Sequence, residues 1–575
     1  MEKQHNRGQD GAGIAAVKLN TEPGYPFMHR LRSGANQPIA DLFAQIGKEI
    51  EEIEKHQPDI KNHPGLMKGH LNYLGEVLLG HLRYGTQGKN NAEFCHPFIK
   101  RHTIPSRNLA LAGNFNLVNT EELFGLVNID PGEFQRQSDL AAMMEVLYHF
   151  LVKADEAFPG EMDIVKVLKK AIPLFDGGFN FSGMLGNGDA FVIRDAHGIR
   201  PSYYYINDDV IVAASERAAI RTAFHLEENE VKELMPGHAL IVKADGSYSL
   251  EQIIEPKERK ACSFERIYFS RGSDEKIYKE RNKLGYLLSD TVLKAIDYDL
   301  KNTIFSFIPN TAETAFYGLI KGAEDYLNKI KVERILSWGK AYDEEKLTDM
   351  INRRIRIEKI AIKDVKLRTF ITEDSSRNEM VQHVYDITYG TVRKKLDTLV
   401  VIDDSIVRGT TLKESIIRML SRLEPKKIIV VSSAPQIRYP DCYGIDMSKM
   451  GDFIAFRAAI ELLNDTGQQH TLTILLDKCK ALQRNNQLHT ENVVRQLYKT
   501  FTPEDISGKI AQLITAPDIH IPVSVIYQTI ESLHEACPTN LGDWYFTGNY
   551  PTPGGNRVCN KAFMNYMEGK NVRGY

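Results

Sequence analysis

Short apolar runs separated by turn residues dominate the first 258 or so positions of the chain. Examples are ALAGNFNLV (110–118), AFVIRD (190–195) and DVIVAAS (209–215). Runs of this length, rich in β-branched and aromatic residues, are typical of strands. The pattern predicts an α+β region in which strands outnumber helices.

The second half of the chain has a different pattern of apolar and polar residues. The runs IFSFIP (304–309), LVVID (399–403) and KIIVVSSA (427–434) alternate with longer stretches of helical periodicity. This alternation predicts an α/β domain with a doubly wound parallel sheet. Between residues 321 and 366 the chain is dense in Lys, Arg, Glu and Asp, which predicts exposed helices.

The segment EPKERKA (255–261) is a charged break between these two regions and predicts a linker or surface loop. We therefore expect domains at residues 1–258 and 259–505. From about residue 506 the chain mixes helical signals with the Gly/Pro-rich segment NYPTPGGN (549–556), which predicts a C-terminal extension, 506–575.

The length and the net charge of the chain exclude several kinds of protein. A chain of 575 residues is too long for one core. The net charge is −3, from 72 basic and 75 acidic residues, so no broad surface for nucleic acid or an anionic membrane is expected. No membrane span or signal peptide is evident, which predicts a cytoplasmic protein. The six cysteines lack any Cys-x-x-Cys spacing, so neither a disulfide framework nor a zinc site is indicated.

The most informative stretch is VVIDDSIVRGTT (400–411). Its apolar start predicts a strand buried on both faces, with Asp403 and Asp404 at the carboxyl end, where open α/β sheets bind ligands. The residues that follow are small, hydroxylated or basic, and their backbone N–H groups suit a phosphate; Thr410 or Thr411 is predicted to cap the next helix. The motif predicts a site for phosphoribosyl pyrophosphate with Mg²⁺, where pyrophosphate is displaced from an anomeric carbon.

Three sequence segments in the first domain are not explained by a phosphoribosyl pyrophosphate site. They are HNRGQDGAGI (5–14), GHLRYGTQG (80–88) and LAGNFNLVN (111–119). Arg83 is suited to clamp an α-carboxylate, Asp139 to hold an α-amino group, and Asn114 to donate to an oxyanion. Taken singly, each of these residues is more often a structural hydrogen-bonding group.

Together these motifs resemble, in order and over nearly the whole length, the amidophosphoribosyltransferases, or glutamine phosphoribosylpyrophosphate amidotransferases. Further matching segments are DAHGIRPSY (195–203), FERIYFSRGSD (264–274), RTFIT (368–372) and SSAPQIRYPDCYGIDM (432–447). The resemblance implies a class II glutaminase domain of the Ntn-hydrolase type, with αββα layers, followed by a type I phosphoribosyltransferase domain. It also implies the first step of purine synthesis, in which glutamine and phosphoribosyl pyrophosphate give phosphoribosylamine, glutamate and pyrophosphate, in a homodimer or homotetramer.

The resemblance also implies roles for individual residues. The residues expected to bind glutamine are Arg7, Arg83, Asn114, Phe115 and Asp139. Those expected to bind phosphoribosyl pyrophosphate are Arg368, Thr369, Asp403, Asp404, Ser405, Arg408, Gly409, Thr410 and Thr411. Thr311, Asp403 and Asp404 would hold the Mg²⁺.

The sequence departs from the family in three respects. The stretch between Pro309 and Arg368 is longer than the family leads us to expect, and we interpret it as an insertion near the mouth of the active site. The family's glutaminase uses a cysteine at the mature N-terminus, and none stands in that position here. We expect the chain as given to begin at an internal Met of a longer protein, the alternative being a natively silent glutaminase half. Some members bind an iron–sulfur cluster through four cysteines; here only Cys262 and Cys537 are near such positions and Asp441 takes a third, so no cluster is expected.

Three other functions remain open at this stage. The second domain alone would make phosphoribosylamine from free ammonia. A non-catalytic regulator that senses phosphoribosyl pyrophosphate is a second possibility, although no DNA-binding module is evident. A salvage-type base phosphoribosyltransferase is a third, but it leaves the first 250 or so residues unexplained.

Overall fold

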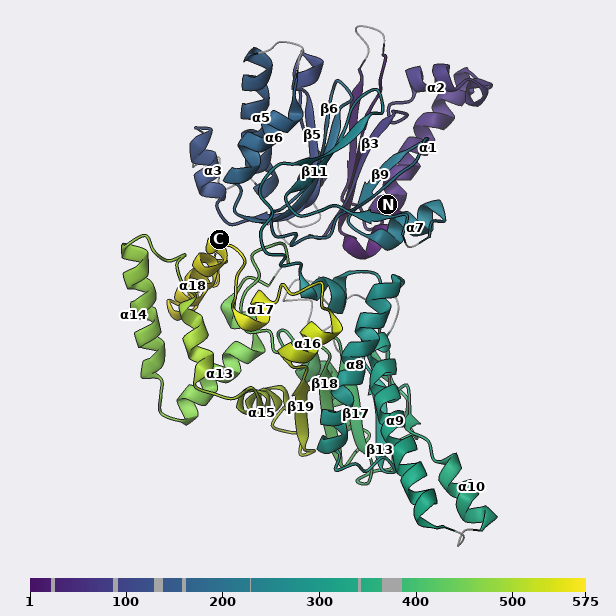
Figure 1. Ribbon diagram of the computed structural model, residues 1–575, viewed down its shortest axis with the longest axis vertical. Helices are drawn as coiled ribbons and strands as arrows, with labels where there is room; N and C mark the ends of the chain where they lie inside the picture. Colours follow the sequence, from purple (N-terminus) through teal and green to yellow (C-terminus); the bar gives the residue numbers. More distant parts are fainter. Residues whose placement is uncertain are drawn as a thin grey trace.

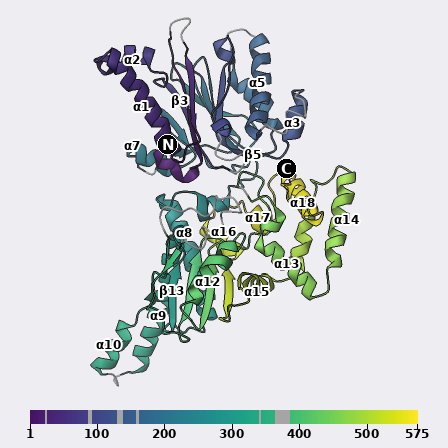
Figure 2. The same ribbon diagram turned by 180° about the vertical axis from the view of Figure 1, so that it is seen from behind.

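The computed structural model describes residues 1–21, 26–85, 92–128, 138–157, 162–227, 229–339, 343–363, 385–445 and 447–574. Strand-rich layers formed by the first part of the chain lie above a helix-flanked sheet formed by the second part, and the C-terminus lies between the two (Figure 1). The reverse view shows the same division (Figure 2). Within the described ranges, no helix is both long and apolar enough to span a membrane.

The first domain packs two layers of strands face to face. One layer contains β2-β1-β3 and β10-β8-β9, and the other is a six-stranded sheet in the order β12-β11-β7-β6-β5-β4. Ala15 and Val17 of β1 pack against Ala110 of β5 and Met184 of β6, so a dry core lies between the layers. The strands are β1 (Gly11–Val17), β2 (Met28–Ser33), β3 (Val77–Arg83), β4 (Phe98–Lys100), β5 (Leu109–Leu117), β6 (Gly177–Leu185), β7 (Ala190–Arg194), β8 (Tyr203–Ile206), β9 (Ile211–Ala214), β10 (Lys232–Glu233), β11 (His238–Val242) and β12 (Tyr248–Gln252).

Helices cover both outer faces of these strands. Ile39 and Leu42 of α1 pack on Ala12 of β1, whereas Leu140 of α5 and Val167 of α6 pack on the six-stranded sheet. The layers are therefore αββα, and the predicted fold class of the first domain is confirmed. The helices are α1 (Pro38–His56), α2 (Pro64–His70), α3 (Thr120–Leu126), α5 (Asp139–Ala157), α6 (Ile164–Ala171) and α7 (Arg217–Phe224).

The second domain is built on a parallel sheet in the order β14-β13-β17-β18-β19, as its sequence pattern predicts. Val400 and Ile402 of β17 face the core beneath α8 and α9, and Leu399 and Val401 face the core on the other side. Burial on both faces explains the unbroken apolar run of this strand. The strands are β13 (Thr303–Phe307), β14 (Arg356–Ile357), β17 (Thr398–Asp403), β18 (Lys427–Ser432) and β19 (Val523–Tyr527), and β15 (Ala361–Lys363) pairs separately with β16 (Tyr385–Ile387).

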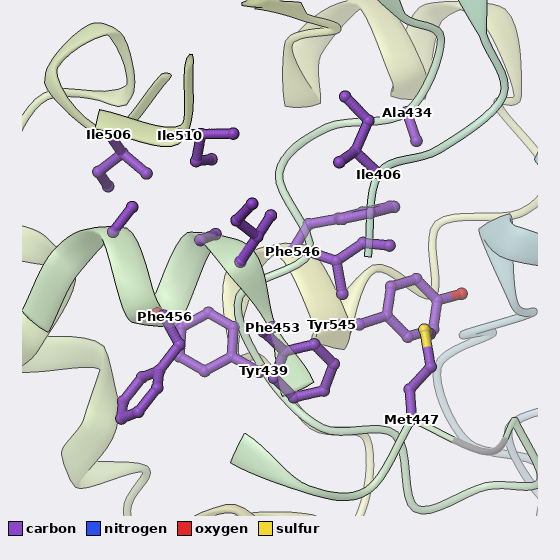
Figure 3. Close-up of a cluster of buried hydrophobic side chains, with 14 of the residues drawn as sticks. Ile406, Ala434, Tyr439, Met447, Phe453, Phe456, Ile506, Ile510, Tyr545 and Phe546 are labelled. Atoms are coloured by element: carbon purple, nitrogen blue, oxygen red, sulfur yellow. The ribbon is translucent and has the colours of Figure 1, made fainter. Parts of the chain in front are cut away.

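The helices of this domain surround the sheet and build the contact with the first domain. On the side of α13, α15 and α17, Ile406, Phe453, Phe456, Ile510 and Tyr545 belong to one large buried cluster (Figure 3). The helices are α8 (Glu275–Ala295), α9 (Glu313–Ser337), α10 (Glu344–Asn352), α12 (Ile417–Ser421), α13 (Ile454–Asp465), α14 (His470–Arg484), α15 (Pro503–Ile514), α16 (Ile530–Ala536), α17 (Trp544–Thr547) and α18 (Pro553–Met567).

Two features of this domain differ from the sequence-based expectations. Strand β19, in the predicted extension 506–575, pairs with β18, so this segment completes the sheet instead of extending the domain. The charged stretch does form the helices α9 and α10, but the expectation that it lies near the mouth of the site is wrong. Helix α10 leads into β14 beside Ile304, at the amino end of β13, and projects from the far end of the molecule (Figure 1).

The cysteines near the family's cluster positions have local protein partners. All six cysteines are free and buried. The Cys262 thiol lies 3.0 Å from the Tyr545 hydroxyl, and the Asp441 carboxylate accepts a hydrogen bond of 2.8 Å from the Trp544 indole. These contacts connect the start of the second domain to its last helices.

The close approach of α8 and α9 depends on two glycines. A Cβ at Gly318 would lie 1.7 Å from the carbonyl oxygen of Asn282, and one at Gly285 would lie 1.6 Å from that of Ala315. We predict that Gly318→Ala lowers the free energy of unfolding by about 3 kcal/mol, because backbone must move to admit the methyl group. Urea denaturation measures this change.

Gly508, in α15, provides the matched control because a Cβ there would meet nothing within 4 Å. Gly508→Ala should stabilise the protein by about 0.5–1 kcal/mol through helix propensity. Equal effects of the two substitutions would contradict the packing argument.

Candidate functional site

Two adjacent carboxylates mark the carboxyl edge of the parallel sheet. Asp403 is the last residue of β17 and Asp404 follows it, as predicted, and both are half-buried. The backbone N–H of Asp404 donates to Asp403 Oδ1 at 2.9 Å, and Ser405 Oγ donates to Asp404 Oδ1 at 2.8 Å. These contacts hold both carboxylates at the edge of the sheet.

The loop after these acids turns sharply at Gly409. Its φ of +71° lies in the left-handed region, and a Cβ there would lie 2.3 Å from Ile454 Cδ1. Only glycine meets both conditions without strain. Arg408 Nη2 donates to Asp452 Oδ2 at 2.8 Å, which anchors the loop to the turn before α13.

The helix after this loop begins differently from the prediction. Thr411 precedes a π-helical turn (Leu412–Ile416), and its side chain makes no capping hydrogen bond. Thr410 already belongs to the helical segment. The predicted cap is therefore wrong, because the helix already begins at Thr410 and the residue before it, Gly409, has no side chain to accept a capping hydrogen bond.

Thr311 lies at the same edge of the sheet as the two acids. It follows β13, which runs parallel to β17 with Phe307 opposite Ile402. Arg368 and Thr369, the predicted base of a closing loop, lie outside the described residues. No group of three or more His, Cys, Asp or Glu side chains suited to a metal occurs in the described part of the chain. A cation at Asp403 and Asp404 would take its remaining ligands from substrate oxygens and water, as Mg²⁺ commonly does.

A large cavity of about 1060 Å³ lies in the first domain and reaches its junction with the second. Its walls come from β3, β5 and the start of α5, together with residues from the second domain. The five residues predicted to bind glutamine all line it: Arg7, Arg83, Asn114, Phe115 and Asp139. Residues separated by more than a hundred positions thus share one pocket.

Histidines 81 and 96 form part of the wall beside Asn114. Their rings lie 4.1 Å apart between centroids, and the His96 ring stacks on that of Phe115 at 5.6 Å. His81 Nε2 donates to the Gly113 carbonyl at 3.1 Å. Burial lowers the pKa of His81 to about 4 and holds the pKa of His96 well below its ordinary value. The pair is therefore neutral and fixes the backbone just before Asn114.

Cys95 does not have the properties of a nucleophile. It is fully buried between β1 and β2, and its thiol contacts the Ser33 carbonyl at 3.5 Å. Burial raises the pKa of the Cys95 thiol, which disfavours the reactive thiolate. Among the described residues, no cysteine lines the cavity.

The carboxyl group of Asp139, at the start of α5, has a shifted pKa. Its Oδ2 accepts a hydrogen bond of 3.0 Å from the Leu117 N–H. Burial raises the pKa of Asp139 to about 6, although the Leu117 hydrogen bond and the Arg573 charge act in the opposite direction. A desolvated carboxylate of this kind favours a cationic ligand group.

Arg7 is tied to the domain junction. Its guanidinium contacts Glu216 at 2.6 Å and Glu265 at 2.8 Å, and all three side chains are largely buried. Arg200 also reaches Glu265, at 3.3 Å. Direct contact between Arg7 and glutamine, as predicted, would require these ion pairs to open.

Several cavity residues were not predicted from the sequence. Arg557, Lys561 and Arg573 come from α18 and the segment after it, and they line the cavity more than 400 residues after Asn114. Gly554 N–H donates to Asp176 Oδ2 at 3.1 Å, which holds the start of this helix against the first domain. No local motif marks such residues; only their position near the end of the chain and their charge could have suggested them.

The fold and the two sites define a class of protein: an αββα glutaminase-type domain joined to a type I phosphoribosyltransferase domain. No protein-family model matches the chain. An amidophosphoribosyltransferase of Pseudomonas aeruginosa is 28% identical over 399 residues, 68% of this chain and 72% of its own. That of Bacillus subtilis is 28% identical over 480 residues, 82% of this chain and 83% of its own.

A solved structure agrees with these relatives. The glutamine phosphoribosylpyrophosphate amidotransferase of B. subtilis, complexed with ADP and GMP, superposes with a TM-score of 0.60 at 22% identity, covering 96% of this chain and 93% of that one. The chain is thus a relative of the amidophosphoribosyltransferases, and the resemblance predicted from its motifs is confirmed.

We predict that Asp139→Asn stabilises the protein by about 1–3 kcal/mol at pH 7 to 8. The folded-state pKa of Asp139 is raised to about 6, so its ionisation destabilises the fold as the pH rises from about 4 to 6. The substitution removes this cost. Thermal unfolding of both proteins between pH 4 and 8 measures it, and the gain should vanish near pH 4. The same gain at every pH would contradict the argument.

Proposed function

We propose that this protein is an amidophosphoribosyltransferase, which forms 5-phosphoribosylamine and pyrophosphate from phosphoribosyl pyrophosphate and a nitrogen donor. The observation that carries the proposal is the presence of two sites in one chain. The Asp403–Asp404 pair and its glycine turn stand at the edge of a parallel sheet, and the cavity with Arg83, Asn114 and Asp139 lies in the adjoining domain. By resemblance, we also propose a homodimer or homotetramer in the cytoplasm.

The transferase site has the parts that displacement at a sugar carbon needs. We propose that Asp403 and Asp404 contact the ribose hydroxyls, and that the backbone from Ser405 to Thr411 holds the 5-phosphate. Gly409 lets the backbone turn closely enough for N–H groups to converge on an anion. Mg²⁺, held at Asp403, Asp404 and Thr311, would neutralise charge on the leaving pyrophosphate.

The glutamine site complements an amino acid with an amide side chain. We propose that Arg83 binds the α-carboxylate and that Asp139, ionised at neutral pH, binds the α-ammonium group. Asn114 and the Phe115 N–H would stabilise the oxyanion formed when the amide is attacked. The neutral His81–His96 pair supports this arrangement because it fixes the Gly113 backbone without adding charge.

The residues that line the cavity indicate which nitrogen donor the chain as given would use. Amide hydrolysis requires a nucleophile at the glutamine site. Because no cysteine among the described residues lines the cavity, we expect this chain to use ammonium and not glutamine. The transferase site does not depend on that nucleophile.

We predict pyrophosphate release from phosphoribosyl pyrophosphate and Mg²⁺ with ammonium, and little with glutamine. Asp404→Asn should lower kcat/KM with ammonium about 10- to 100-fold, because a hydrogen bond to a charged group is lost. Coupled-enzyme detection of pyrophosphate measures both rates.

The control variant is Asp290→Asn, which removes an exposed carboxylate of α8 that pairs with Lys294 at 2.6 Å. It should leave the rate unchanged. Absence of activity with ammonium would refute the transferase assignment, and rapid turnover with glutamine would refute our account of the first domain. Activity only with a purine base would indicate a salvage enzyme.

A further inference from the structure

Arg281 is a buried arginine of α8 that holds the first segment of the second domain. Its side chain is 5% exposed. Nε donates to the Arg266 carbonyl at 2.7 Å, and Nη2 donates to the carbonyls of Tyr268 and Ser270 at 3.0 and 2.7 Å. The remaining nitrogen, Nη1, has no hydrogen-bond partner among the described residues and lies beside Gly272, where an added Cβ would be 3.3 Å away.

The charge of Arg281 has no counter-ion in the described part of the chain. Its three acceptors are neutral carbonyl groups, whereas other buried arginines nearby have carboxylates: Arg266 pairs with Glu280, and Arg217 pairs with Asp274 at 2.6 Å. Removing a guanidinium from water without an anion is costly. Burial lowers the pKa of Arg281 to about 10, and the carboxylate that opposes this shift most strongly is Asp404.

The geometry of α8 places Arg281 near the transferase site. One turn after Arg281, the Leu284 carbonyl accepts a hydrogen bond of 2.8 Å from Gln528 Nε2. The Gln528 N–H in turn donates to the carbonyl of Ser432, which lies opposite Asp403 in the sheet. This turn of α8 therefore lies against the carboxyl edge of the sheet, where we propose that the loop from Ser405 to Thr411 holds the 5-phosphate. The pyrophosphate group of phosphoribosyl pyrophosphate has so far been given Mg²⁺ but no side chain of the protein as a cationic partner. A guanidinium with a free nitrogen is well suited to its oxygens.

We infer that Arg281 binds the pyrophosphate group of the substrate and of the product, with Nη1 as the donor and the three backbone contacts fixing its orientation. This inference rests on the proposed transferase function. The anion that the buried guanidinium lacks is then supplied by the ligand, so its positive charge contributes to binding and not to the stability of the free protein.

The test compares Arg281→Lys and Arg281→Met with the unmodified protein, using ammonium, Mg²⁺ and phosphoribosyl pyrophosphate. We expect Arg281→Met to raise KM for phosphoribosyl pyrophosphate and the inhibition constant of added pyrophosphate about 10- to 100-fold. Arg281→Lys, which keeps the charge, should recover part of both losses. A second readout is the rise in Tm that pyrophosphate with Mg²⁺ produces, which should shrink in both variants.

Arg194 provides the matched control. It is 1% exposed and donates to the carbonyls of Gly198, Arg200 and Leu234, but it lies in the first domain and pairs with Glu233. Arg194→Met should lower Tm and leave KM and pyrophosphate inhibition unchanged.

The outcomes separate the two proposals. If the unmodified protein has no activity with ammonium, the proposed function fails. If it is active but the Arg281 variants keep its KM and its pyrophosphate inhibition, Arg281 is only structural and the inference is wrong. If Arg281→Met does not fold, Arg281→Lys and its Tm shift with pyrophosphate decide the question.

Discussion

The buried carboxylate of Glu265 is the contact on which the joining of the two domains depends. It is 2% exposed and receives Arg7 from the start of the chain, Arg200 from the loop between β7 and β8, and the Ser270 hydroxyl. Burial acts to raise the pKa of Glu265, but the two guanidinium groups outweigh it and hold that pKa below its ordinary value. Withdrawal of either arginine would leave this buried charge less well compensated, which favours keeping the three segments together. The same contacts hold the wall of the cavity against the second domain.

A second constraint is the burial of the parallel sheet on both faces. Strand β17 is covered on each side, so the residues between its ends are all apolar and its polar residues stand at the two ends, Thr398 and Asp403. Neighbouring strands run in the same direction, so Thr311 after β13 and Ser433 after β18 reach the same edge. The Ser433 hydroxyl donates to the Asp404 carbonyl at 3.1 Å, which ties the two strand ends together. The chemistry of the site is therefore a consequence of how the sheet is packed.

These two constraints explain what could be predicted from the sequence. The strand, the acid pair and the glycine turn were predictable because their determinants lie within twelve consecutive residues. The start of the helix at Thr410 was not, because it depends on how closely the Gly409 turn packs on Ile454, a residue far along the chain. The Arg7–Glu265 ion pair and the presence of Arg573 at the cavity depend on contacts between residues hundreds of positions apart. Neither periodicity nor a local motif predicts contacts of this kind. The position of α10 at the far end of the sheet was not predicted for the same reason.

The two candidate sites share one electrostatic arrangement. In each, a charged side chain is desolvated more than its protein partners compensate, so its pKa moves toward the neutral form: upward for Asp139 and downward for Arg281. Each shift costs the free protein stability. In the proposed function, a ligand group of opposite charge, an α-ammonium at Asp139 and a pyrophosphate at Arg281, would offset that cost on binding. By contrast, Arg7 and Glu265 have counter-ions within the protein and serve the fold. The distinction between structural and ligand-binding charges in this chain therefore lies in whether the protein itself provides the counter-ion, and not in how deeply the charge is buried.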